Sequence, residues 1–121
     1  MPFLVHERDP LVLADIFETL AGAFSEVVHH VPDLSLLRDL LLRPAADLDV
    51  YVLSIDRRDI ETALSDVLPR MLDSKVVLIS NSLPDTFELS GGRAFVSRPF
   101  TSESLLKGVN AVLSDPPSDP Q

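Results

Sequence analysis

Short apolar runs alternate with longer segments of helical periodicity along this chain, and the alternation restricts the folds open to it. Runs rich in β-forming residues cover residues 3–6, 27–30, 50–55, 76–79 and 94–96. Between and after them, apolar residues recur every three or four positions, as on one face of a helix, over residues 11–24, 33–43, 60–72 and 101–113. Because parallel strands need crossover connections, which helices usually provide, the pattern predicts a doubly wound α/β fold with helices on both faces of a parallel sheet.

Three segments sharpen this expectation. Residues 50–55 are apolar apart from Ser54, which is typical of a strand covered on both faces. Residues 60–72 carry the clearest helical periodicity, and Pro69 is expected to bend that helix. Residues 81–93 include a proline and a Gly-Gly pair and leave little room for a full helix. The fourth helix of the fold is therefore expected to be short or missing.

Length and composition point to a single domain over residues 1–114. The chain has 121 residues, 45% of them apolar and 24% charged, enough for one packed core. Residues 115–121 hold three prolines and no core residue, so a disordered tail is expected. The absence of cysteine excludes disulfides, cysteine-type zinc sites and thiol catalysis. No signal-like segment and no apolar run of about 20 residues is present, which favours a soluble, cytoplasmic protein without a membrane partner.

The charge balance bears on partners. Nineteen acidic residues against ten basic ones give a net charge of −9. Such a chain lacks the basic surface that supplies most non-specific affinity for nucleic acids, so DNA or RNA binding is not expected.

Three short segments carry a family resemblance. Residues 3–11 read FLVHERDPL, residues 49–56 read DVYVLSID, and residues 95–100 read FVSRPF. Together they resemble the receiver domain of bacterial response regulators, the CheY-like superfamily, over nearly the whole chain. The resemblance implies a flavodoxin-like sheet of five strands in the order 2-1-3-4-5. In such sheets the functional site lies beyond the carboxyl ends of the strands.

The receiver pattern has five chemically distinct positions. Receivers usually carry a phosphoaccepting aspartate at the end of the third strand, two acids after the first strand, a hydroxyl after the fourth strand, and a lysine before Pro-Phe. The acids hold a divalent metal, and the lysine and hydroxyl bind the incoming charge. In this chain those positions hold, in the same order, Ser54, Glu7 and Arg8, Ser80, and Arg98.

Two of these residues have changed chemical class. Ser54 offers a neutral hydroxyl, which needs a base to act as a nucleophile and would give a stable ester. Arg8 carries a permanent positive charge and cannot coordinate Mg²⁺. The resemblance therefore implies a degenerate receiver, with no catalytic residue, bound metal or cofactor. Arg8 and Arg98 are expected to pair with Glu7, Asp9 or Asp56.

Other interpretations remain open at this point. Asp56 is two residues beyond Ser54 and shares its face, so it could be the phosphoacceptor. The spacing argues against this, because receivers commonly place an aspartate five positions before the acceptor, as Asp49 stands before Ser54. Arg8, Arg98, Ser54 and Ser80 could instead converge on an anion. A flavodoxin-like ligand-binding domain is disfavoured because no phosphate-binding loop is present.

The expected function is a stand-alone receiver-like module in bacterial two-component or phosphorelay signalling. Its expected partners are signalling proteins: a histidine kinase, a phosphotransfer protein or another regulator. A homodimer is compatible with the sequence. Phe95 stands where receivers place an aromatic that switches rotamer, although packing in the core is its simpler role. His6 is expected to be a packed, neutral histidine.

Overall fold

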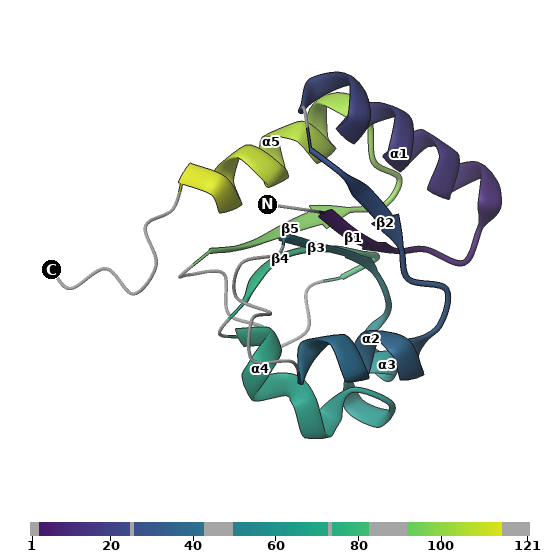
Figure 1. Cartoon of the computed structure of the whole chain (residues 1–121), viewed down its shortest axis with the longest axis vertical. Helices are drawn as coiled ribbons and strands as arrows, with labels where there is room; N and C mark the ends of the chain where they lie inside the picture. The colour runs from purple at the N-terminus through teal and green to yellow at the C-terminus, as the bar shows by residue number, and fades with distance from the viewer. Residues whose placement is uncertain (1–2, 25, 43–49, 73, 83–91, 115–121) are drawn as a thin grey trace, which may run out of the picture.

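The computed structural model describes residues 3–24, 26–42, 50–72, 74–82 and 92–114. The elements, in chain order, are β1 (Phe3–His6), α1 (Pro10–Ala23), β2 (Val28–His30), α2 (Leu34–Leu41), β3 (Val50–Ser54), α3 (Arg57–Thr62), the 3₁₀ turn η2 (Ser65–Val67), α4 (Leu68–Leu72), β4 (Lys75–Ser80), β5 (Arg93–Ser97) and α5 (Ser102–Ser114). The strands form one sheet in the order β2-β1-β3-β4-β5, and every neighbouring pair is parallel. Helices α1 and α5 cover one face, and α2, α3 and α4 cover the other (Figure 1). The predicted doubly wound fold and strand order are confirmed.

Strand alternation divides the core into two apolar layers. Val50 and Val52 of β3 pack with residues of α1 and α5, whereas Tyr51 and Leu53 pack with residues of α2, α3 and α4. All five residues of β3 are buried, as expected for a strand covered on both faces. Each strand therefore presents alternate side chains to opposite layers, and this parity decides which residues reach a given site at the end of the sheet.

His6 belongs to this buried part of the sheet. The residue is 1% exposed, and its Nδ1 atom lies 2.8 Å from the carbonyl oxygen of Val31, the residue that follows β2. The contact ties the end of β1 to the chain beyond the edge strand, in agreement with a packed histidine.

The segment 60–72 departs from the prediction of one helix bent at Pro69. The α3 helix begins at Arg57 and ends at Thr62, η2 follows, and α4 starts at Leu68. The interruption therefore precedes Pro69, which stands in the first turn of α4, where the missing backbone N–H breaks no intrahelical hydrogen bond. Apolar residues of all three pieces still pack in the same core layer, which explains why the periodicity looked continuous: Ile60, Leu64, Val67 and Met71.

Two expectations fall outside the described residues. The short or missing fourth helix was expected within 81–93, of which 83–91 are not described, and the disordered tail was expected over 115–121. In the described part of the chain, no helix combines the length and the apolar character needed to cross a bilayer.

An ion pair connects α2 to η2 and lowers the pKa of a carboxyl group. The Nε atom of Arg38 donates to both carboxylate oxygens of Asp66, at 3.1 and 3.0 Å. These hydrogen bonds, with the positive charge of Arg38, hold the pKa of Asp66 below its ordinary value of 3.8. A lowered folded-state pKa means that the carboxylate stabilises the fold at neutral pH. This stabilisation is lost as the pH falls through the folded-state pKa.

We expect Arg38→Gln to raise the pKa of Asp66 toward 3.8, because the charged donor is removed. An NMR titration of side-chain carboxyl carbons measures this directly. Arg8→Gln is the matched control and should leave the Asp66 titration unchanged, because Arg8 pairs with a different carboxylate, that of Asp59. An Asp66 pKa equal in wild type and Arg38→Gln would contradict the assignment.

Candidate functional site

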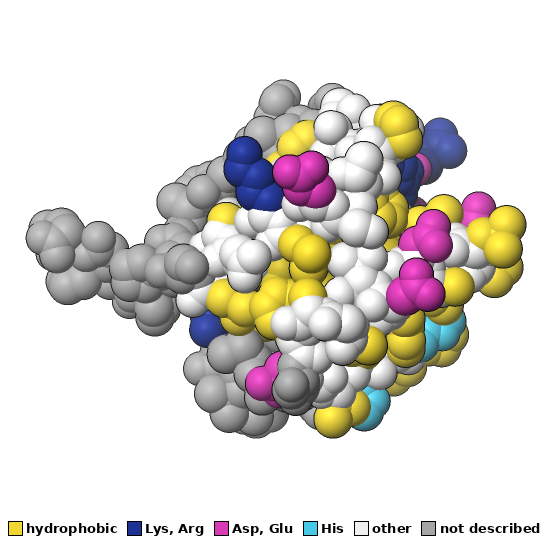
Figure 2. Space-filling model, turned by 90° about the horizontal axis from the view of Figure 1, so that it is seen from above, with side chains coloured by type: hydrophobic (Ala, Val, Ile, Leu, Met, Phe, Trp, Pro, Cys, Tyr) yellow, Lys and Arg dark blue, Asp and Glu magenta, His cyan; other side chains and the backbone are white. Residues whose placement is uncertain are grey.

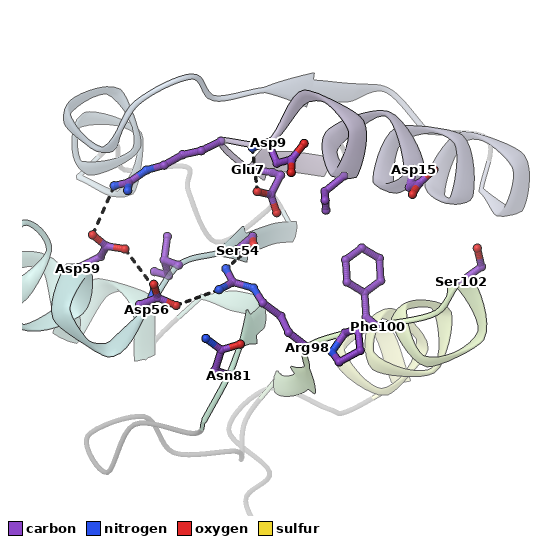
Figure 3. A pocket seen from close by; sticks show the side chains of 14 residues that line it. Glu7, Asp9, Asp15, Ser54, Asp56, Asp59, Asn81, Arg98, Phe100 and Ser102 are labelled. Atoms are coloured by element: carbon purple, nitrogen blue, oxygen red, sulfur yellow. Dashed lines mark hydrogen bonds and ion pairs between the residues drawn. The ribbon is translucent and has the colours of Figure 1, made fainter.

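A cleft with a volume of about 840 Å³ opens at the carboxyl ends of β1, β3 and β5. Its walls come from the loop between β1 and α1, the start of α1, the end of β3 with the start of α3, and the loop between β5 and α5 (Figure 3). This is the place where a doubly wound sheet binds ligands. Five carboxylates and two guanidinium groups line it, and the pairing among them determines its chemistry: Glu7, Asp9, Asp15, Asp56, Asp59, Arg8 and Arg98.

Arg98 links three elements inside the cleft. It follows β5, and its backbone N–H donates to the carbonyl oxygen of Ser80 at 3.0 Å. Its Nη2 atom donates to Ser54 Oγ at 2.7 Å, and its Nη1 atom donates to Asp56 Oδ1 at 3.0 Å (Figure 3). Ser54 is buried at the end of β3, and Asp56 is the N-cap residue of α3. One guanidinium therefore bonds both to Ser54, at the expected acceptor position, and to Asp56, the alternative candidate.

Arg8 pairs with a different aspartate from Arg98. Its Nη2 atom lies 3.4 Å from Asp59 Oδ1, and the Arg8 side chain is 67% exposed. The other Asp59 oxygen, Oδ2, accepts a hydrogen bond from the Asp56 backbone N–H at 3.1 Å. Asp59 was not among the expected partners of Arg8, which were Glu7, Asp9 and Asp56. The acidic residue three positions after Asp56 is the recognisable sign of a helix that starts at Arg57.

Glu7 and Asp9 bond to backbone groups of their own loop. Glu7 is buried, and its Oε2 atom accepts a hydrogen bond from the Asp9 backbone N–H at 3.0 Å. Asp9 caps α1, because its Oδ1 atom accepts from the Leu11 backbone N–H at 2.9 Å. Neither carboxylate pairs with a guanidinium in the described part of the chain, so the two arginines are neutralised only on the α3 side of the cleft.

Ser80 and Phe95 are separated from the other predicted residues by strand parity. Ser54 lies opposite Ile79 in the sheet, on the α1 and α5 face, whereas Ser80 has the opposite parity. Of the described residues, those that line the cleft include Asn81 in place of Ser80. Phe95 packs against the core layer beneath α2, α3 and α4, on the face opposite Val96, which agrees with a packing role. Phe100, two residues after Arg98, lines the cleft instead.

The donor set does not fit the divalent metal that the receiver pattern implies. A hard cation such as Mg²⁺ needs several oxygen ligands converging in octahedral geometry. The acceptor position holds Ser54, whose hydroxyl is bonded to a guanidinium, and the second acidic position holds Arg8. Among the described residues, no group of three or more histidine, aspartate and glutamate side chains is placed to hold a metal ion. The chemistry of the cleft therefore depends on the ion pairs that Arg8 and Arg98 form with Asp59 and Asp56.

Comparison with solved structures shows which known proteins share this fold. Family models and curated proteins give no match. Among solved structures, SdrG from Sphingomonas melonis Fr1 is similar over 93% of this chain and 96% of its own, with a TM-score of 0.66 and 18% identity. The Vibrio cholerae chemotaxis protein CheY4 is similar over 92% of this chain and 97% of its own, with a TM-score of 0.61 and 14% identity. The stress response regulator PhyR has a TM-score of 0.59 and 19% identity over 93% of this chain, which spans 44% of the PhyR chain. The resemblance to receivers is thus confirmed as a shared CheY-like fold.

Proposed function

We propose, from the premise of a CheY-like receiver fold, that this chain is a signalling module that binds other proteins and does not accept a phosphoryl group on an aspartate. The observation that carries the proposal is the contact between Arg98 Nη2 and Ser54 Oγ at 2.7 Å. It places a permanent cation, already hydrogen bonded, on the residue that stands where receivers keep their acceptor carboxylate.

The chemistry of this contact disfavours phosphoryl transfer to Ser54. A serine hydroxyl becomes a nucleophile when a neighbouring base removes its proton. Here Ser54 Oγ receives a hydrogen bond from a guanidinium, which has no lone pair to accept a proton and stays charged at any physiological pH. The position therefore behaves as an anchor for Arg98.

Asp56 supports a second candidate, an ordinary phosphoacceptor. Its side chain is 56% exposed and lines the cleft, so a phosphodonor could reach it. Against this, Asp56 lies beyond the last residue of β3, and Arg8 stands in place of the second acid that would bind the divalent cation. Measurement of the intact mass after treatment with a phosphodonor separates the two candidates and is developed below.

The same geometry argues against binding of an anion in the cleft. Five carboxylates line the cleft against two guanidinium groups, and both guanidinium groups already pair with aspartates. An incoming phosphate would have to displace a carboxylate from Arg98 and would then face the remaining acids, so like-charge repulsion opposes its entry.

The proposed setting is bacterial two-component or phosphorelay signalling in the cytoplasm, and the proposed role is non-enzymatic. The partner classes that suit it are a histidine kinase, a phosphotransfer protein or another regulator. A module of this kind would respond to the presence of its partner and not to its own phosphorylation state.

The experiment that tests this function is affinity capture from a lysate of the native cells, with and without acetyl phosphate and Mg²⁺. The wild-type chain should retain the same signalling proteins in equal amounts under both conditions. A matched Arg8→Asp/Ser54→Asp variant, which restores the acidic positions, should become sensitive to acetyl phosphate. Wild-type capture that depends on acetyl phosphate, or that retains no signalling protein, would contradict the proposal.

A further inference from the structure

We propose that the outer edge of β2, the edge that faces away from β1, pairs with the same edge of a second copy of this chain. The two sheets then join into one continuous sheet. β2 lies at the border of the sheet, and among the described residues β1 is the only strand that pairs with it (Figure 1). An unpaired strand edge presents backbone N–H and C=O groups with which another strand can pair.

The hydrogen bonds between β1 and β2 identify the backbone groups on this outer edge. The carbonyl oxygen of Val27 accepts a hydrogen bond from β1 at 2.8 Å, and Val31 N–H donates to a carbonyl oxygen of β1 at 2.7 Å. Backbone groups alternate in direction along a strand, so His29, midway between these two residues, also turns toward β1. The N–H and C=O groups of Val28 and His30 therefore point outward.

The outward groups favour an antiparallel pairing centred on His29. A twofold axis at this residue places Val28 of each copy opposite His30 of the other, and each such pair exchanges N–H···O=C hydrogen bonds in both directions. Both outward residues of β2 are then paired. The His29 residues of the two copies face each other as a non-hydrogen-bonded pair, with their Cα atoms about 4.5 Å apart.

The charge of this segment favours a second copy of the chain as the occupant. The chain carries a net charge of −9 with histidine neutral, so two copies repel each other as a whole. Residues 27–32 read VVHHVP and hold no acidic or basic residue other than the two histidines. Val27 is 60% exposed, and Figure 2 shows histidine side chains beside hydrophobic ones at the border of the molecule. Pairing at β2 covers exposed apolar surface without bringing carboxylates of this segment together.

The proposed dimer leaves the cleft of each copy open. No residue of β2 is among the described residues that line the cleft. Because the two paired strands run in opposite directions, the two clefts lie at opposite ends of the joined sheet. The strand has three residues, so the interface is smaller than the roughly 1,200 Å² of stable complexes. We expect a transient dimer with a Kd of about 0.1 mM.

Cysteine cross-linking tests the pairing and its register, because the chain has no cysteine of its own. In the proposed dimer, two cysteines at position 29 lie within reach of a disulfide. Two cysteines at position 27 lie about 13 Å apart, because each faces position 31 of the other copy. Under mild oxidation of the full chain at about 0.3 mM, His29→Cys should form a disulfide-linked dimer about ten-fold faster than the matched control Val27→Cys. Equal rates would overturn the pairing.

Sedimentation velocity measures the association without a cross-link. The wild-type chain should be mostly dimeric at about 1 mM and mostly monomeric at about 10 μM. His30→Pro removes an outward N–H that β1 does not use, so it should keep the chain monomeric at about 1 mM. His29→Glu should have the same effect, because two like charges would face each other. Leu11→Glu adds the same charge at an exposed position of α1, outside the strand, and should leave the dimer intact.

Circular dichroism of each variant shows whether the chain is folded. A wild-type chain that is monomeric at about 1 mM would overturn the proposal. A dimer that persists in both His30→Pro and His29→Glu would also overturn it, because the copies would then associate through another surface.

Discussion

Replacing Gly108 by alanine is expected to lower the free energy of unfolding by about 2 kcal/mol. Gly108 lies in α5 where the helix approaches the sheet closely, and an added Cβ would lie 2.8 Å from Val96 Cγ2 and 3.5 Å from Val77 Cγ1. Val96 is buried and β-branched, so its methyl group has little freedom to move aside. Either α5 shifts away from the sheet or Val96 is strained, and both costs exceed the roughly 1 kcal/mol that alanine gains over glycine in a helix.

Gly22 provides the matched control for this measurement. It lies in α1, is exposed, and has no atom within 4 Å of an added Cβ. Gly22→Ala should therefore raise the free energy of unfolding by about 0.5 kcal/mol through helix propensity alone. Urea denaturation followed by circular dichroism compares the two variants. Opposite signs are expected, and a Gly108→Ala chain as stable as wild type would show that α5 does not press on β5 as described.

Much of the fold could be predicted from local sequence patterns, because strands and helices leave different apolar periods. The run 50–55 marked the central strand correctly, since burial on both faces demands apolar residues at every position. Residues 60–72 were misread for a related reason. A periodicity reports which side chains reach the core, and the pieces of α3, η2 and α4 keep the same side chains buried although the helix is broken.

The composition of the site was harder to predict, because it depends on pairings across the sheet. Arg98 and Asp56 were recognised as candidates, and the structure brings them together with Ser54. The Arg8–Asp59 pair joins residues 51 positions apart, and no local pattern connects them. Ser80 was placed in the cleft by its position at the end of a strand. Strand parity, which follows from the register between β3 and β4, directs it to the other face.

The second large effect concerns phosphoryl transfer and bears on the central claim. The Arg8→Asp/Ser54→Asp variant places a carboxylate at the end of β3 and a second acid after Glu7, which together restore a nucleophile and the oxygen ligands of a divalent cation. Arg98 then faces a carboxylate with which a guanidinium can form a charge-assisted hydrogen bond. Exposure to acetyl phosphate and Mg²⁺ should modify this variant. The same treatment should leave the wild-type chain unmodified, because Ser54 has no neighbouring base and Arg8 stands in place of the second acid that would bind the divalent cation.

Intact-mass spectrometry of the wild-type chain after incubation with acetyl phosphate and Mg²⁺ is the most direct test. The account predicts a single species at the unmodified mass for wild type, and the mass of one added phosphoryl group for Arg8→Asp/Ser54→Asp under the same conditions. A phosphoryl adduct on the wild-type chain that disappears in Asp56→Asn would contradict it and identify Asp56 as a working acceptor.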